Sequence, residues 1–120
     1  MKAGSLGKEY SKGEIVFRQG SEGDCMYVIM EGRVEVVSES NGNSVRIAVL
    51  EKGDFFGEMA IFQKEARTAT IRTLTDTRLL TVDKKAFLSR IEEDPSLAFR
   101  IVETLSRRIT KVNQALLAKS

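Results

Sequence analysis

The sequence contains no histidine and a single cysteine, Cys25. Histidine-based acid–base catalysis is therefore excluded, as are disulfides within one chain and zinc or iron–sulfur sites built from several cysteines. A metal-dependent enzyme that needs a cluster of histidines is excluded on the same ground. No apolar run is long enough to span a membrane, and residues 1–10 lack the apolar core of a signal peptide. We therefore expect a cytoplasmic protein that holds no metal and is not an enzyme.

Length and composition predict one globular domain, residues 1–120. Hydrophobic residues make up 42% and charged residues 30% of the chain, so disorder of the whole chain is not expected. The net charge of +2 is small, but residues 96–120 carry five basic residues against one acidic residue. Such a group is more often the solvated face of a helix than a nucleic-acid contact. We therefore expect no direct nucleic-acid binding from this segment.

Short strands separated by glycine-containing turns are expected over residues 14–83, after a loose segment at residues 1–13. The expected strands are residues 14–18, 25–30, 34–39, 45–50, 68–75 and 77–83. Asn41-Gly42 between two of them is a strong signal for a tight hairpin. Apolar residues alternate with other residues on both sides of this turn, which predicts a half-buried antiparallel pair. The alternating apolar residues are Val34, Val36, Val45, Ile47 and Val49.

Helices are expected at the C-terminal end of the chain. A short one covers residues 84–91, and a long one follows Asp94-Pro95, with proline in its first turn. Two series of apolar residues recur every seven positions on the long helix: Ala98, Leu105 and Val112, and Val102, Ile109 and Leu116. Their 3–4 spacing is that of a coiled-coil seam, although such a stripe can also pack on the protein's own strands. We expect a homodimer through this helix.

These elements together predict the α+β fold class, mainly β with C-terminal helices. An antiparallel β-roll or jelly roll would cover residues 14–83, and the C-terminal helices would cover residues 84–120.

One stretch concentrates the polar residues expected to bind a ligand. Gly57 and Glu58 lie in a short apolar turn, and Arg67 comes nine residues after the carboxylate. A glutamate, an arginine and backbone N–H groups at the start of a short helix suit a ligand that carries both hydroxyls and negative charge. The alternative is that Glu58 and Arg67 pair with each other and that the glycines serve only turns.

Four blocks of the sequence resemble the cyclic nucleotide-binding domain. This family includes the regulatory domains of cyclic-nucleotide-dependent kinases and gated channels, and the bacterial catabolite activator proteins. The blocks are residues 14–20 (EIVFRQG), 26–36 (MYVIMEGRVEV), 53–60 (GDFFGEMA) and 67–70 (RTAT). Their order and spacing fit the family, and the resemblance covers roughly residues 10–118. Members that keep the fold without the nucleotide usually lose the glutamate or the arginine, and both are present here.

The resemblance implies a phosphate-binding cassette whose short helix is residues 57–62. In it, Glu58 would accept a hydrogen bond from the ribose 2′-hydroxyl, Arg67 would pair with the cyclic phosphate, and N–H groups near Gly57 would complete the phosphate shell. Thr68 would lie beside the phosphate, and in some relatives a threonine there also touches a guanine amino group. The full set of expected ligand-binding residues is Phe56, Gly57, Glu58, Met59, Ala60, Arg67, Thr68, Ala69 and Asn113.

Recognition of the base is where this sequence departs from its relatives. Bacterial activators place hydroxyl residues of the long helix on the adenine, whereas this chain has Val112 and Asn113 there. The amide of Asn113 can face an adenine edge, or it can face solvent. The expected regulatory ligand is cyclic AMP (cAMP), with cyclic GMP (cGMP) as the alternative, and Thr68 is the one residue that suits a guanine.

The predicted function is a sensing regulatory module. Binding of the cyclic nucleotide would reposition the C-terminal helix, and the effector domain that reads the change lies outside this chain. The alternative is a dimerising sensor domain of a bacterial transcription regulator that binds another ligand or none.

Overall fold

A computed structural model describes residues 7–118, which form two compact units. The first, the β-roll unit, extends to Lys84, and the second, the helical unit, begins at Lys85. The β-roll unit contains β1 (Lys8–Tyr10), β2 (Ile15–Phe17), β3 (Cys25–Glu31), β4 (Arg33–Ser40), β5 (Asn43–Glu51), β6 (Phe55–Phe56), α1 (Met59–Phe62), β7 (Thr70–Thr73) and β8 (Thr77–Asp83). The expectation of a single domain over residues 1–120 stays a prediction.

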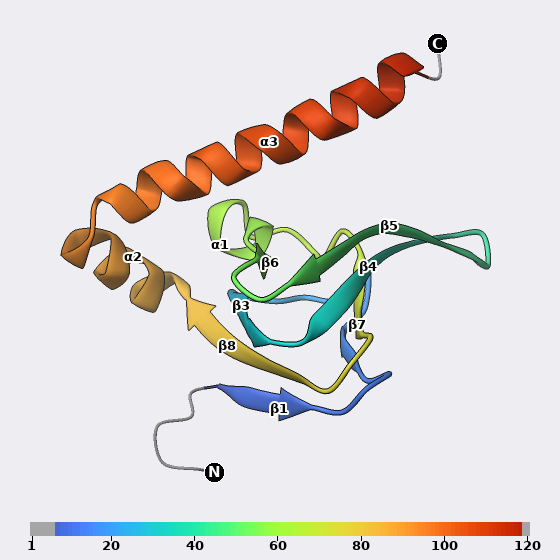
Figure 1. Ribbon diagram of the computed structural model, residues 1–120, viewed down its shortest axis with the longest axis horizontal. Helices are drawn as coiled ribbons and strands as arrows, with labels where there is room; N and C mark the ends of the chain where they lie inside the picture. The colour runs from blue at the N-terminus through green and yellow to red at the C-terminus, as the bar shows by residue number, and fades with distance from the viewer. Residues whose placement is uncertain (1–6, 119–120) are drawn as a thin grey trace. The chain divides into compact units, whose positions relative to one another are not determined.

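The strands form two antiparallel sheets (Figure 1), with the orders β1-β8-β3-β6 and β2-β7-β4-β5. The core cluster takes side chains from both sheets, so it lies between them. Its buried members are Tyr10, Ile29, Val34, Phe56, Ile71 and Leu79. The expected antiparallel β-roll is therefore confirmed. This core fixes β6, the strand that leads into the predicted cassette and pairs with β3.

The segment expected to be loose contains a strand. β1 pairs with β8, Lys8 opposite Leu79 and Tyr10 opposite Thr77. Tyr10 is buried in the core, which explains why this short polar segment is ordered. Gly7 precedes the strand at φ 95°, where a Cβ would lie 2.4 Å from the Leu79 carbonyl oxygen. Glycine is therefore required for this close approach.

The β4–β5 hairpin forms as expected, but β5 presents its other face to the core. Asn41 and Gly42 have φ of 52° and 81°, which suits a tight hairpin turn. Leu50 pairs with the buried Val34, so Leu50 lies on the inner face. Val49, like Val45 and Ile47, is exposed. The prediction that these three residues lie on the buried face is wrong, because a shift of one residue in a strand exchanges its two faces.

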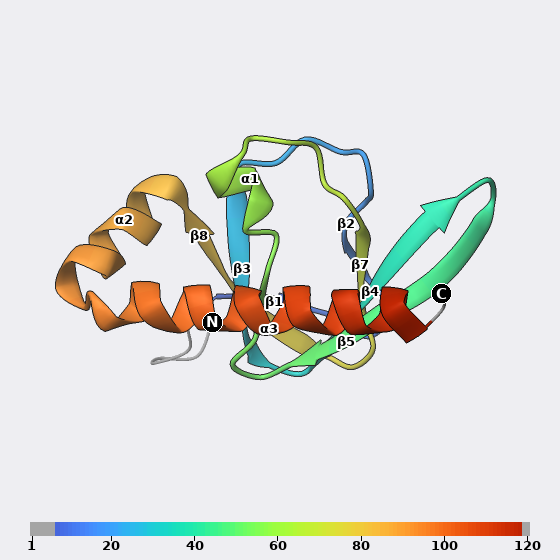
Figure 2. The ribbon, with the colours of Figure 1, turned by 90° about the horizontal axis from the view of Figure 1, so that it is seen from above.

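A buried carboxylate, Glu35, pairs with two arginines on this hairpin and the neighbouring strand. Glu35 is only 4% exposed, and it accepts hydrogen bonds from Arg46 Nε (2.9 Å) and Arg72 Nε (2.7 Å). Burial alone would raise the pKa of Glu35, but the two arginines hold it below its ordinary value. The ladder also shifts register between Val36 and Val37. Figure 2 shows the hairpin projecting beyond the other strands of its sheet.

The helical unit contains α2 (Lys84–Glu93), which begins at the unit boundary, and α3 (Ser96–Ala118). Asp94 lies just before α3 and caps its start, since its carboxylate accepts hydrogen bonds from the backbone N–H and the hydroxyl of Ser96. Val102, Ile109 and Val112 of the predicted seam are each more than half exposed. Within residues 7–118, none of the helices combines the length and the apolarity needed to cross a bilayer.

Candidate functional site

Arg67 lies in the loop between α1 and β7, and its backbone ties this loop to the turn that follows β2. The Arg67 N–H donates to the carbonyl of Ser21 (2.8 Å), and its carbonyl accepts from the N–H of Gly20 (2.7 Å). These two bonds fix the point where the side chain starts. The side chain is buried, with only 7% of the residue exposed, so its position is determined by what surrounds the guanidinium.

In the part of the chain that the structure describes, uncharged groups hold the guanidinium of Arg67. Nη1 donates to the carbonyl of Gly57 (3.0 Å), and Nη2 donates to Sγ of Cys25 (3.7 Å). Cζ lies 4.2 Å from the ring centroid of Phe17 and 5.7 Å from that of Tyr27. Nε is buried and has no hydrogen-bond partner among the described residues. A buried cation without an anion is costly, so this site favours an anionic ligand that supplies the missing acceptor.

The ion pairs of residues 7–118 do not include one to Arg67. The alternative in which this arginine serves only as the partner of Glu58 is therefore not the arrangement observed. A carbonyl oxygen, a sulfur and two aromatic rings hold the guanidinium instead.

Two glycines allow the guanidinium to lie against the backbone. A Cβ at Gly23 would lie 2.4 Å from both Nε and Nη2 of Arg67. A Cβ at Gly57 would lie 2.7 Å from Nη1, and Gly57 has φ of 79°, which favours glycine for a second reason. The sequence predicts Gly57 as a ligand-binding residue but does not include Gly23 among the expected site residues. Nothing in the sequence near Gly23 indicates that Arg67, 44 residues later, packs on it.

Aromatic residues form one wall of the site. Phe56 stacks on Tyr27 with ring centroids 5.2 Å apart, and Phe17 lies 5.8 Å from each of them. Phe56 is 4% exposed and belongs to the core cluster, so it supports the site through its packing against Tyr27 and Phe17. Burial, followed by a hydrogen bond with Cys25, raises the pKa of Tyr27 to about 12, although Arg67 acts in the opposite direction. Tyr27 is therefore neutral at ordinary pH and does not compensate the charge of Arg67.

The predicted cassette helix is shorter than expected, since α1 begins at Met59 rather than Gly57. Glu58 directly precedes it in helical conformation, and its carbonyl accepts the N–H of Ile61 (2.9 Å). Ala60 and Ile61 are buried, which anchors the turn. The N–H of Ala60 donates to the Gly57 carbonyl (3.3 Å), the same oxygen that accepts from Arg67. Gly57 thus joins the helix turn to the arginine.

The remaining predicted residues are spread more widely. Thr68 is exposed and Ala69 is buried, and both lie between Arg67 and β7. Met59 is half-buried at the start of α1. Asn113 lies on α3 and is exposed. Because α3 belongs to the helical unit, the role of Asn113 stays a prediction.

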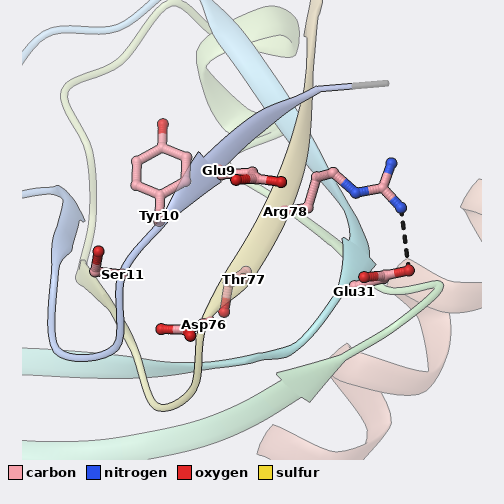
Figure 3. A pocket seen from close by; sticks show the side chains of 7 residues that line it. All are labelled: Glu9, Tyr10, Ser11, Glu31, Asp76, Thr77 and Arg78. Atoms are coloured by element: carbon pink, nitrogen blue, oxygen red, sulfur yellow. Dashed lines mark ion pairs between the residues drawn. The ribbon is translucent and has the colours of Figure 1, made fainter. Parts of the chain in front are cut away.

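A second hollow lies elsewhere on the β-roll unit, with a volume of about 530 Å³ (Figure 3). It is lined by Glu9, Tyr10, Ser11, Glu31, Asp76, Thr77 and Arg78. Arg78 pairs with Glu31 (3.2 Å) across it, and the buried Thr77 hydroxyl donates to the Thr75 carbonyl (2.8 Å). No group of three or more acidic, cysteine or histidine residues suited to a metal ion occurs in the described part of the chain. The predicted ligand-binding residues all lie outside this hollow.

Comparison with known proteins gives a family for this fold and site. The family model for the cyclic nucleotide-binding domain matches residues 7–94. The chain is similar to the CRP-like cAMP-activated global transcriptional regulator of Mycobacterium tuberculosis, at 29% identity over 90% of this chain and 49% of that protein. It is also similar to the cAMP-dependent protein kinase regulatory subunit of Schizosaccharomyces pombe, at 44% identity over 65% of this chain and 18% of that protein.

Among solved structures, the Thermus thermophilus catabolite activator protein matches with a TM-score of 0.82 and 28% identity, over 91% of this chain and 52% of that chain. The chain thus spans about half of each bacterial relative and less than a fifth of the kinase subunit. It belongs to the cyclic nucleotide-binding domain family, as the resemblance predicted, and it is similar to regulatory members of that family.

Proposed function

We propose that this chain is a cyclic nucleotide sensor, selective for cAMP, in which Arg67 binds the cyclic phosphate. The observation that carries the proposal is the buried guanidinium, which has one N–H without an acceptor and no paired carboxylate among the described residues. A cyclic phosphate carries one negative charge and has free oxygens that can accept this N–H, in the charge-assisted contact that arginine makes best.

The other predicted residues take the roles that complete the ligand. Glu58 accepts a hydrogen bond from the ribose 2′-hydroxyl, and the backbone N–H groups near Gly57, Glu58 and Met59 face the phosphate, with Ala60 beside them. Thr68 and Ala69 flank the phosphate next to Arg67, and Phe56 supports the floor of the site. Asn113 of α3 contacts the base. The preference for cAMP is supported by the names of two relatives, one cAMP-activated and one cAMP-dependent.

Binding acts as a switch if the ligand has different affinities for two positions of the C-terminal helices. The size of the shift is then limited by that difference in affinity. We propose that α3 also forms the dimer, because Val102, Ile109 and Val112 are apolar, exposed and spaced as a coiled-coil seam. The domain that reads the switch would lie outside this chain, in line with the part of its relatives that the chain covers. The chain itself would have no catalytic activity.

Isothermal titration calorimetry with cAMP and cGMP tests the ligand. We expect micromolar or tighter binding of cAMP, weaker binding of cGMP, and a loss of about 100-fold or more in Arg67→Gln. Truncating one partner of a buried charged pair costs about 2–5 kcal/mol, and tenfold in affinity is about 1.4 kcal/mol. Arg33→Gln is the matched control, since Arg33 is an exposed arginine of β4, and it should bind as the wild type does.

The outcome also separates the two candidate functions. The proposal is contradicted if neither nucleotide gives a heat of binding with a protein that is folded by circular dichroism. It would favour the alternative, a dimerising sensor domain that binds another ligand or none.

A further inference from the structure

The thiol of Cys25 touches the guanidinium that is proposed to bind the phosphate. Cys25 begins β3 and is partly exposed, and its Sγ accepts Nη2 of Arg67 at 3.7 Å. Arg67 is more than nine-tenths buried, and its Nε has no acceptor within residues 7–118. A partly exposed residue therefore places its sulfur beside a buried cation that lacks an anionic partner among the described residues.

We propose that Cys25 is a redox modification site, and that an oxygen added to its sulfur occupies Arg67 and excludes the cyclic phosphate. This inference rests on the proposed function only for its effect on nucleotide binding. The contact between Cys25 and Arg67 is independent of any ligand.

The chemistry requires a hydroperoxide as the oxidant. The sulfur of Cys25 attacks the outer oxygen of ROOH, so that a sulfur–oxygen bond forms and the oxygen–oxygen bond breaks. The sulfur loses two electrons, and the peroxide is reduced to ROH, which takes up the thiol proton. The product is a sulfenic acid, which thiols can reverse, and a second equivalent of ROOH gives a sulfinic acid with a full negative charge.

The geometry explains why the added oxygen would bind Arg67. The guanidinium is held beside the sulfur, because it lies against the backbone at Gly23 and Gly57 and the Phe17 ring covers one face. The oxygen would lie next to Nη2 and could accept its N–H more strongly than sulfur does. The neutral Tyr27 hydroxyl provides no competing anion. Oxidised Cys25 thus acts as an internal substitute for the phosphate.

Two substitutions test this competition without any oxidant. Cys25→Asp places a carboxylate beside Arg67, and Cys25→Asn places a neutral side chain of the same shape there. We expect Cys25→Asp to bind cAMP about tenfold or more weakly than Cys25→Asn in calorimetry, the size typical of one charge-assisted contact. Equal affinities of the two variants would overturn the proposal.

A readout without nucleotide separates this inference from the proposed function. In thermal unfolding, Cys25→Asp should melt at a higher temperature than Cys25→Asn, and the difference should vanish when Arg67→Gln is added. If the wild type binds no nucleotide but this difference is observed, the proposed function fails and the pairing of Arg67 with an anion at position 25 stands. If the difference persists without Arg67, the pairing is refuted.

The modification itself is tested by peptide mass spectrometry after treatment with hydrogen peroxide. We expect one added oxygen on Cys25, removed by dithiothreitol, and a parallel loss of cAMP binding. Cys25→Ser, treated in the same way, controls for oxidation of methionines such as Met59 in α1. An unmodified Cys25, or an equal loss of binding in Cys25→Ser, would refute the proposal.

Discussion

Replacement of Gly23 by alanine is predicted to weaken nucleotide binding while leaving the fold intact. The new Cβ would lie 2.4 Å from Nε and 2.5 Å from Cζ of Arg67, which is closer than atoms can approach. The end of the arginine side chain can move away at little cost to folding. Gly23 is also absent from the glycines with positive φ, so its backbone tolerates alanine. The perturbation therefore acts on the position of Arg67.

The magnitude follows from the contacts that hold the guanidinium. A displaced Arg67 loses its hydrogen bond to Gly57 (3.0 Å) and its contact with the Phe17 ring (4.2 Å), and it no longer meets the phosphate in the right place. A hydrogen bond to a charged group contributes about 1.5–3 kcal/mol. We therefore expect cAMP to bind about 10- to 150-fold more weakly.

Calorimetry with cAMP and thermal unfolding measure the two effects separately. Gly53→Ala is the matched control, because Gly53 has φ of 93° but, apart from its chain neighbours, none of the described residues comes within 4 Å of the added Cβ. This control should lose about 1–2 kcal/mol of stability through backbone strain and keep its affinity. Binding of cAMP by Gly23→Ala within twofold of the wild type would show that Gly23 does not position Arg67, and so would an equal loss of affinity in Gly53→Ala.

Three further predictions address the cation, the buried carboxylate and the dimer. Arg67→Lys should bind cAMP about 10- to 100-fold more weakly in calorimetry, because an ammonium keeps the charge but not the planar fork of donors; wild-type affinity would contradict this. Because the pKa of Glu35 is lowered in the folded protein, the ionised carboxylate stabilises the fold at pH values above its ordinary pKa of 4.5. This stability is lost as pH falls through the lowered pKa. Denaturant titrations should therefore show Glu35→Gln to be less stable than the wild type at pH 7, with a gap that closes under acid conditions; a gap independent of pH would contradict this. Ile109→Asp should convert a dimer to a monomer in light scattering, whereas Thr110→Asp should not; a monomeric wild type at high concentration would exclude the seam.

The fold could be predicted from the sequence where local signals are strong. Asn41-Gly42 fixed the hairpin, and Asp94-Pro95 marked the start of the long helix, because turn and cap residues act over a few positions. The inward face of β5 could not be predicted. Val45, Ile47 and Val49 alternate with other residues in the pattern expected of a buried face. The pairing of β5 with β4 nevertheless turns Leu50 inward instead.

The candidate site could be predicted only in part for a similar reason. Gly57 and Arg67 were recognised because they lie within one short motif, and the structure joins them by a hydrogen bond. Gly23, Cys25 and Phe17 also contact Arg67, but they lie more than 40 residues earlier in the chain. Only the folding of β2 and β3 beside the cassette loop brings these residues to Arg67, and no local sequence pattern indicates these contacts.

The central claim is that the unsatisfied N–H of Arg67 receives the cyclic phosphate. A crystal structure of this chain with cAMP tests it most directly. We expect a phosphate oxygen within hydrogen-bonding distance of Nε of Arg67, with the guanidinium still hydrogen-bonded to the Gly57 carbonyl. A nucleotide bound with its phosphate elsewhere, and Nε still without an acceptor, would contradict it.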